Sequence, residues 1–315
     1  MVRQNKILFF LLLLGGHLLA QKNDTSLYRL KSVERELQAL QKTTFYSRSE
    51  SERLEGNKQF LAMWDLIIDN PRVLDYPFDS LKDVSILRPK DHKFTLITWN
   101  IPREDGSHVF FGYLLVNNSK RIKTGFLRHQ TIEAFESFKL LDRSMTIKSP
   151  ELHSGGPDKW FGMLYTQLIE SGDCYTLIGW DGNNKLTTRK FVDVLWFKPD
   201  GSPVFGKDIF KLNRKNPRRL MFEYSADVTM SLKYDSKRNQ IVYNHLASKQ
   251  EGGLLDGQYQ FYGPDGSFDA LEWIKNRWVV KEDIDAHFER GKNDSYPENS
   301  KPKPEKQKAL YKPKK

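Results

Sequence analysis

The sequence predicts an α+β protein in which antiparallel β-strands dominate: an N-terminal helical segment followed by a β-meander that forms a sandwich-like pair of sheets. Three observations lead to this prediction. Apolar residues recur at three- and four-residue steps in the first part of the chain, the spacing changes to two from Phe94, and turn sequences rich in Gly, Asn and Asp separate the later apolar runs. We expect the helical segment to span residues 21–90 and the β-rich domain to span residues 91–290.

Residues 1–20 have the layout of a secretory signal peptide. Basic Arg3 precedes the apolar run Ile7–Leu14, and Ala20 is a small residue at the expected cleavage point. The bulky Leu18 leaves the cleavage point open, and an uncleaved N-terminal anchor is the alternative. No later apolar run has the length of a membrane span. The sequence therefore predicts an exported protein of the periplasm, the cell surface or the extracellular space.

Two amphipathic patterns predict the helical segment. The first places apolar side chains on one helix face at Leu27, Leu30, Val33, Leu37 and Leu40. The second begins at Ser49, because Ser49 and Glu52 have the spacing of a capping box, and it ends at Asn70-Pro71. Gly56-Asn57 is a candidate break within this second helix.

From Phe94 onward the sequence predicts strands. Residues 94–101 and 109–116 flank the turn sequence Glu104–Ser107 and predict a β-hairpin. Residues 131–143 are expected to interrupt the strands as a helix, because their apolar side chains share one helical face. We expect the later strands near 160–169, 174–180, 189–198, 219–224, 228–234, 240–245, 258–262, 270–274 and 277–281, with turns at Asp181–Asn184, Pro199–Gly201 and Pro264–Gly266.

The charge distribution argues against nucleic-acid binding. The chain has 50 Lys plus Arg and 40 Asp plus Glu, a net charge of +10. Two of these charges lie in residues 1–20 and five in the Lys- and Pro-rich segment 291–315, which leaves +3 for residues 21–290. A body so close to neutral lacks the basic face that phosphate contacts need. We expect residues 291–315 to be a disordered tail that either holds the protein to an anionic surface or only keeps it soluble.

The motif search predicts a protein without a recognisable catalytic centre. Cys174 is the single cysteine, so no intrachain disulfide can form, and its apolar neighbours predict a buried, inert thiol. The chain contains no G-x-S-x-G, H-E-x-x-H, G-x-G-x-x-G or P-loop sequence, and its histidines lack the spacing of zinc ligands. We therefore predict no bound metal and no cofactor, with Ca²⁺ left open as described below.

Two segments contain the candidates for a binding site. Trp180, Asp181 and Asn183 lie together at one predicted turn, and Tyr262 and Asp265 border another. Aromatic rings can stack on sugar rings or contact a protein partner. Carboxylate and amide oxygens can bind Ca²⁺. The alternative is that the rings belong to the core and that Asp-Gly-Asn is only a tight turn.

A looser calcium site is a second possibility for one of these segments. Asp265, Ser267 and Asp269 have the alternating spacing of the first three ligands of a calcium loop. An EF-hand is excluded, because Ala270 stands where the loop needs Gly and Asn276 stands where it needs Glu.

Glu223 and Asp227 are the candidates for catalysis. Both lie on or beside predicted strands, where facing carboxylates can act as general acid and base on a glycosidic bond. Carboxylates at strand ends are more commonly solvated, so hydrolysis is the less favoured interpretation.

Several motifs carry a resemblance to a known family. They are Tyr175–Asn183, Lys190–Val194, Pro203–Gly206, Phe222–Ser225, Met230–Asp235 and Tyr262–Gly266. Together they resemble a family of exported, functionally uncharacterised proteins from Bacteroidota, over residues 158–285. The resemblance implies an envelope or extracellular location and a β-rich body, and it implies no catalytic residues.

These observations predict an exported, non-catalytic β-rich module that binds a protein partner or a glycan at the cell envelope. The alternative is a periplasmic or secreted hydrolase that uses strand-borne carboxylates, for which Glu223 and Asp227 are the candidates.

Overall fold

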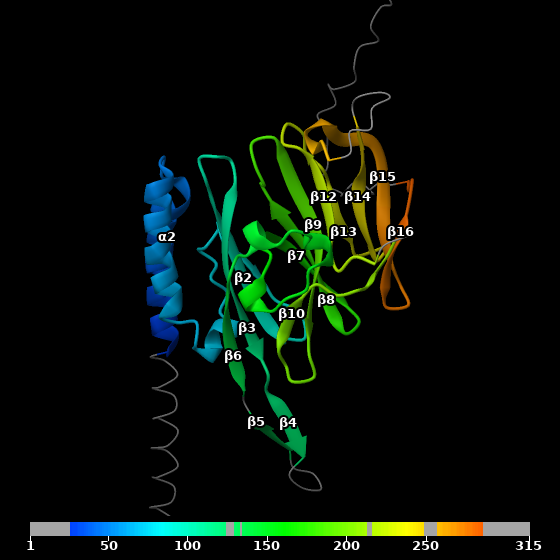
Figure 1. Ribbon diagram of the computed structural model, residues 1–315. Coiled ribbons are helices and arrows are strands. Elements are labelled where there is room, and N and C mark those ends of the chain that lie inside the picture. The colour runs from blue at the N-terminus through cyan, green and yellow to red at the C-terminus, as the bar shows by residue number, and fades with distance from the viewer. Residues whose placement is uncertain (1–25, 124–128, 133, 213–215, 249–256, 286–315) are drawn as a thin grey trace, which may run out of the picture. The chain divides into compact units, whose positions relative to one another are not determined.

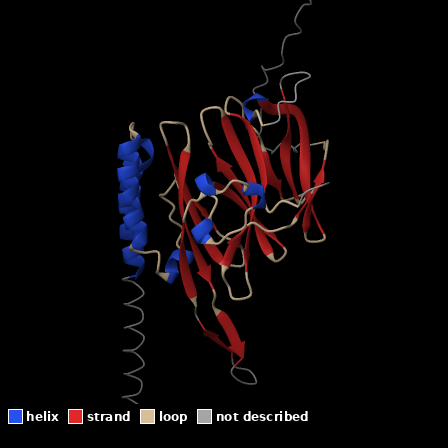
Figure 2. Cartoon of the chain, in the orientation of Figure 1, coloured by secondary structure: helices blue, strands red, loops and turns tan. Residues whose placement is uncertain are grey.

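Three sheets, almost entirely antiparallel, stack on one another, and two helices cover the outer face of the first sheet (Figures 1 and 2). The computed structural model describes residues 26–123, 129–132, 134–212, 216–248 and 257–285. The predicted signal peptide and the predicted tail lie outside these residues. The predicted α+β class, with helices first and a sandwich of antiparallel sheets after them, is confirmed.

The two predicted N-terminal helices are present, and the second is continuous. They span residues 26–46 and, as α2, Glu50–Asp65. Ser49 caps α2 as predicted, since its side chain accepts a hydrogen bond from the Glu52 backbone N–H at 3.2 Å. The candidate break at Gly56-Asn57 is wrong. Gly56 fits against the first helix, where a Cβ would lie 3.0 Å from the Thr44 nitrogen.

Short 3₁₀ helices fill the connections between the larger elements. Asn70 begins η1 (Pro71–Leu74), which follows α2, and its side chain accepts from the Arg72 backbone N–H. The others are η2 (Ser144–Thr146), η3 (Pro150–Leu152), η4 (Pro157–Lys159) and η5 (Tyr259–Phe261). No helix in the described part of the chain is both long and apolar enough to span a membrane.

Sheet I has the strand order β1-β2-β3-β6. Its strands are β1 (Ser85–Leu87), β2 (Phe94–Pro102), β3 (His108–Asn117) and β6 (Phe135–Leu140). Strands β4 (Lys120–Lys123) and β5 (His129–Ile132) pair separately with each other. The predicted hairpin is confirmed, because β2 and β3 pair along their whole length from Phe94↔Val116 to Pro102↔His108.

The helix predicted at residues 131–143 is wrong, because this region contains the end of β5 and all of β6. Phe135 and Phe138 would share one face of a helix. In the strand they point to opposite faces, so that Phe135 packs against the helices and Phe138 packs toward the second sheet. Pairing with β3 decides the structure here over the local pattern.

Sheet II has the order β10-β9-β8-β7, and β12 also pairs with β9. Its strands are β7 (Leu164–Ser171), β8 (Cys174–Asp181), β9 (Thr187–Phe197), β10 (Pro203–Phe205) and β12 (Leu220–Ser225). Both faces of this sheet are buried. On β9, Val192 and Val194 face the third sheet while Phe191 and Leu195 face sheet I.

Sheet III has the order β11-β16-β15-β14-β13, and β11 alone runs parallel to its neighbour. Its strands are β11 (Phe210–Lys211), β13 (Leu232–Asp235), β14 (Gln240–Ser248), β15 (Tyr262–Ile274) and β16 (Arg277–Lys281). Two predictions fail here: the strand at 258–262 is mainly η5, and Pro264–Gly266 lies within β15 at a bulge opposite His245.

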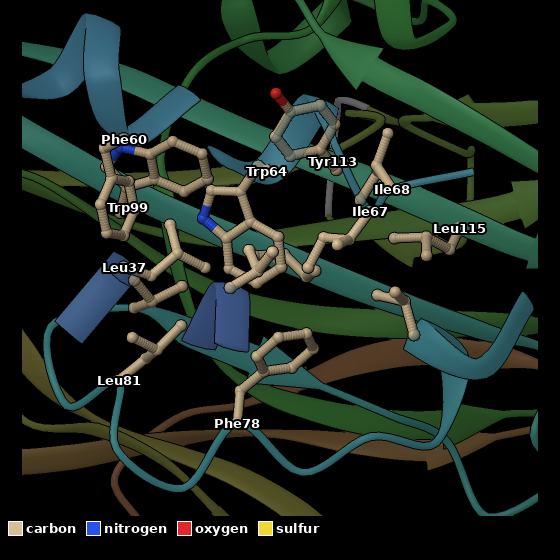
Figure 3. Packing of buried hydrophobic residues seen from close by; sticks show 14 of the residues in the cluster. Leu37, Phe60, Trp64, Ile67, Ile68, Phe78, Leu81, Trp99, Tyr113 and Leu115 are labelled. Atoms are coloured by element: carbon tan, nitrogen blue, oxygen red, sulfur yellow. The ribbon is translucent and has the colours of Figure 1, made fainter. Parts of the chain in front are cut away.

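The helices and sheet I share one core, which is rich in aromatic side chains. Figure 3 shows this packing around Leu37, Phe60, Trp64, Ile67, Ile68, Phe78, Leu81, Trp99, Tyr113 and Leu115. The indole of Trp99 donates to Asn57 Oδ1 on α2 at 2.8 Å. The helical segment therefore covers one face of sheet I and has no separate core of its own.

Candidate functional site

Three predicted site residues meet at one end of sheet II: Asp181, Asn183 and Glu223. Asp181 on β8 pairs in register with Arg189 on β9, and Arg189 pairs with Glu223 on β12. Cross-strand partners point to the same face of a sheet, so these side chains form a row of carboxylate, guanidinium and carboxylate. Arg189 Nε donates to Glu223 Oε2 at 2.7 Å, and the Glu223 side chain is almost fully buried.

The Glu223 carboxylate binds the turn that joins β8 to β9. Its Oε1 atom accepts from Thr187 Oγ1 at 2.8 Å and from Asn183 Nδ2 at 3.2 Å. Asn183 has a left-handed backbone, with φ of 53°, and its N–H donates to Asp181 Oδ1 at 2.8 Å. Both oxygens of Glu223 therefore have protein donors, an arrangement that fixes the turn and leaves this carboxylate poorly placed as a nucleophile or base.

Trp180 and Asp181 differ in their surroundings. Burial raises the pKa of the Asp181 carboxyl to about 6, although the Asn183 backbone N–H and Arg189 act against this rise. The Trp180 ring has the imidazole of His108 packed against it at 5.0 Å between ring centroids. Burial lowers the pKa of His108, so a largely neutral imidazole covers part of the predicted aromatic platform.

Asp227 does not join the carboxylate row. It lies exposed in the turn after β12, and its backbone N–H donates to Ser225 Oγ at 3.3 Å. The side chains that donate hydrogen bonds to Glu223 are those of Asn183, Thr187 and Arg189. The structure therefore does not bring the two predicted catalytic carboxylates into contact.

Tyr262 and Asp265 lie on sheet III, away from the strands of Trp180 and Asp181. Tyr262 packs on Tyr259 at 5.8 Å between ring centroids, and Asp265 Oδ1 accepts from the backbone N–H and the hydroxyl of Ser267. Asp269 accepts from His245 Nδ1 at 2.9 Å and from the Asp283 N–H at 3.0 Å. Among the described residues, no three His, Cys, Asp or Glu side chains converge as a metal site.

An apolar pocket with a volume of about 580 Å³ lies between sheets II and III. The pocket is lined by Leu220, Met221 and Phe222 of β12, by Tyr243 of β14 and by Val280 of β16, together with the polar residues Ser149, Glu151, Asn216 and Arg219. The Phe222 and Tyr243 rings pack together at 4.8 Å between centroids. Concave, mostly apolar sites of this size are typical of pockets that enclose a small molecule.

The segment that contains η3 forms the mouth of the pocket. Leu152 lies at the mouth with 60% of its surface exposed, beside Glu151. Two hydrogen bonds to backbone carbonyls fix this segment to the start of β12. The Arg218 backbone N–H donates to the Glu151 carbonyl at 2.7 Å, and the Arg219 side chain donates through Nη1 to the Pro150 carbonyl at 2.7 Å. An exposed leucine held at a pocket mouth provides apolar surface for a ligand that enters.

A fully buried ion pair lies on the face of sheet II that is turned toward sheet I, beside Tyr165 and Phe161. Arg219 lines the pocket and donates through Nε to Asp193 Oδ1 at 2.9 Å, with both side chains at 0% exposure. Asp193 Oδ2 also accepts from the Tyr165 hydroxyl at 2.7 Å. Burial and the neighbouring Asp193 raise the pKa of Tyr165 well above its ordinary value. The charge on Arg219 is therefore countered within the protein.

Sequence reasoning missed this pocket. Its walls come from segments that lie far apart in the chain, and their convergence depends on the stacking of sheets II and III. The sequence signals were weak: an isolated Leu152 in a polar loop, and Arg219 next to an apolar strand. Comparisons of the chain with protein-family models, curated proteins and solved structures give no match.

Proposed function

We propose that the protein is an exported, non-catalytic binding module that encloses an apolar ligand of the cell envelope in the pocket between sheets II and III. The observation that carries this proposal is the pocket itself, about 580 Å³ in volume and lined mainly by aliphatic and aromatic side chains. The export signal predicted for residues 1–20 supports the location.

Binding fits the described geometry better than hydrolysis. Of the two predicted catalytic carboxylates, Glu223 has hydrogen-bond donors on both oxygens and Asp227 is exposed in a turn. Glu151 is the single carboxylate among the described residues that line the pocket. Glycosidic hydrolysis ordinarily needs two carboxyl groups that flank the substrate, and this arrangement supplies no such pair.

An apolar ligand fits the pocket better than a glycan or an anchoring side chain. A sugar carries many hydroxyl groups, and most of them would lie against apolar side chains without partners, because Ser149, Glu151 and Asn216 can pair with only a few. A single side chain of a protein partner would fill only part of a pocket that has the volume of a small-molecule site. We therefore propose a small molecule with an apolar body in place of the protein partner or glycan that the sequence predicts.

The test is the binding of a hydrocarbon probe to the full chain. Diphenylhexatriene fluoresces when it enters an apolar site, and we expect it to bind at the pocket. The Leu152→Asp variant places a charge at the mouth and should weaken this binding at least fivefold. The control is Leu186→Asp, since Leu186 is equally exposed, at 63%, and lies in the turn between β8 and β9.

Thermal unfolding should show that both variants remain folded, because both leucines are exposed. The proposal is overturned if the probe fails to bind, or if Leu152→Asp and Leu186→Asp bind it as tightly as the unmodified protein does.

A further inference from the structure

The Tyr243 hydroxyl is a polar group without a protein partner in a mainly apolar pocket, whose other polar lining residues are Ser149, Glu151, Asn216 and Arg219. Tyr243 lines the pocket and is only 7% exposed, and its ring is held against Phe222. Within the described residues, the hydroxyl makes no hydrogen bond to another protein group. The hydroxyl is not among the fully buried polar atoms of the described residues, so it is accessible to a hydrogen-bond partner from outside the protein. An atom of a ligand bound in the pocket would be the hydrogen-bond partner of this hydroxyl.

The charges near Tyr243 indicate what that atom is. Asp269 and Glu282 both act electrostatically on the Tyr243 hydroxyl, and Glu151 lines the same pocket. An anionic head group at this hydroxyl would be repelled by these acids. The nearest cation of the lining, Arg219, is already paired with Asp193. A carboxylate ligand therefore finds no free counter-charge among the described pocket residues.

A cationic head group is disfavoured for a different reason. Asp269 already binds His245 Nδ1 and the Asp283 N–H, and it does not line the pocket. An ammonium group beside Tyr243 would lose its hydration against Leu220 and Val280 with no direct ion pair to replace it. Burial, with Asp269 and Glu282 adding to it, raises the pKa of Tyr243, so the hydroxyl keeps its proton and can donate it.

We propose that the pocket selects ligands in which an apolar chain ends in a neutral hydrogen-bond acceptor, such as the carbonyl of an acyl ester or amide, and that the Tyr243 hydroxyl donates to this acceptor. The inference rests on the proposed function, because it assigns the ligand class for the same pocket. The apolar chain fills the space between β12 and the facing strands, and the carbonyl lies at Tyr243.

The experiment measures displacement of diphenylhexatriene from the full chain by four twelve-carbon competitors. They are monododecanoyl glycerol, N-methyl dodecanamide, dodecanoate and dodecylamine, each used below its micelle-forming concentration. We expect the ester and the amide to bind at least tenfold more tightly than the carboxylate and the amine. The Tyr243→Phe variant keeps the ring but removes the hydroxyl, so it should weaken the ester and the amide five- to tenfold.

The matched control is Tyr234→Phe. Tyr234 lies on the neighbouring strand β13, outside the pocket lining, and its hydroxyl donates to Asn239. This variant should leave every affinity unchanged. Diphenylhexatriene itself has no acceptor, so its binding should be the same in all three proteins.

The outcomes separate the two proposals. Suppose first that the probe binds and that Leu152→Asp weakens its binding, so that the binding module stands. The proposed ligand class is then wrong if Tyr243→Phe leaves the affinity for the ester unchanged. It is also wrong if dodecanoate or dodecylamine binds as tightly as the ester. If the probe does not bind, or binds without regard to Leu152, both proposals fail.

Discussion

Replacing Arg219 by Met should destabilise the protein far more than removal of a surface charge does. The Arg219 guanidinium and the Asp193 carboxylate are both completely buried, and they are joined by a hydrogen bond of 2.9 Å. Met has a side chain of similar length, so the main loss is the charge and its hydrogen bonds. Asp193 would keep the Tyr165 hydroxyl and the Val194 N–H as donors and would lose its counter-ion.

Breaking a buried ion pair by removing one partner costs about 3–5 kcal/mol, because the remaining charge stays in a poorly solvated site. That is a large part of the roughly 5–15 kcal/mol that stabilises a typical domain. The control is Lys58→Met. Lys58 and Glu55 are 73% and 60% exposed, and an exposed pair of this kind contributes about 0–1 kcal/mol.

Urea unfolding followed by tryptophan fluorescence measures the loss in free energy of unfolding for Arg219→Met and for Lys58→Met. The comparison requires that the dependence of this free energy on urea concentration is the same in each variant. The double variant Arg219→Met/Asp193→Asn removes the orphaned charge and should recover more than half of the lost stability. A loss below about 1 kcal/mol for Arg219→Met would refute the reasoning. A double variant as unstable as the sum of the two single variants would refute it as well.

Two further predictions concern hydrogen bonds that the structure assigns to named side chains. Asn57→Ala should cost about 1–3 kcal/mol, because it leaves the buried indole N–H of Trp99 without its acceptor, and a lowered melting temperature would measure this loss. Glu223→Gln should cost about 1–2 kcal/mol by removing the charged partner of Arg189. By contrast, exposed Asp227→Asn should stay within about 0.5 kcal/mol. Equal effects of these last two variants in urea unfolding would contradict the assignment of Glu223 to the turn.

The sequence correctly predicted those elements whose structure depends on residues close together in the chain, such as hairpin turns and helix caps. The β2–β3 hairpin follows from a turn sequence between two alternating runs, and the start of α2 follows from the cap at Ser49. The region 131–143 shows the limit of this reasoning. Its apolar spacing suits a helix, and only its pairing with β3 makes it a strand. Gly266 is similar, since a positive φ suits a bulge inside β15 as well as a turn between strands.

The candidate sites depended still more on long-range contacts. Asp181, Asn183 and Glu223 were each singled out from the sequence. Their meeting depends on the register of β8, β9 and β12, which no local pattern fixes. That register also changes the interpretation of Glu223, because it places Arg189 and Thr187 on the carboxylate. The pocket needs the stacking of two whole sheets, and strand order is not encoded within any short segment.

The carboxylate row makes stability depend on pH through Asp181. Burial holds the pKa of this carboxyl at about 6, above its ordinary 3.8. Below about pH 3 the carboxyl is protonated in both the folded and the unfolded chain, and its burial carries no charge penalty. Between pH 4 and 6 the unfolded chain releases the proton while the folded protein keeps it. The contribution to stability is therefore lost as the pH rises, and the full loss is reached above about pH 7.

A rise of this size corresponds to about 3 kcal/mol, at about 1.4 kcal/mol for each pKa unit. Asp181→Asn removes the titrating group and keeps an oxygen for the Asn183 N–H, so it isolates the effect of the charge. Relative to the unmodified protein, the variant should gain up to about 3 kcal/mol in free energy of unfolding between about pH 3 and pH 7.5, measured by urea unfolding. Asp173→Asn is the control, because Asp173 is 81% exposed. If the free energies of unfolding of Asp181→Asn and the unmodified protein differ by the same amount at every pH in this range, burial of a charge at Asp181 does not govern the stability of this end of sheet II.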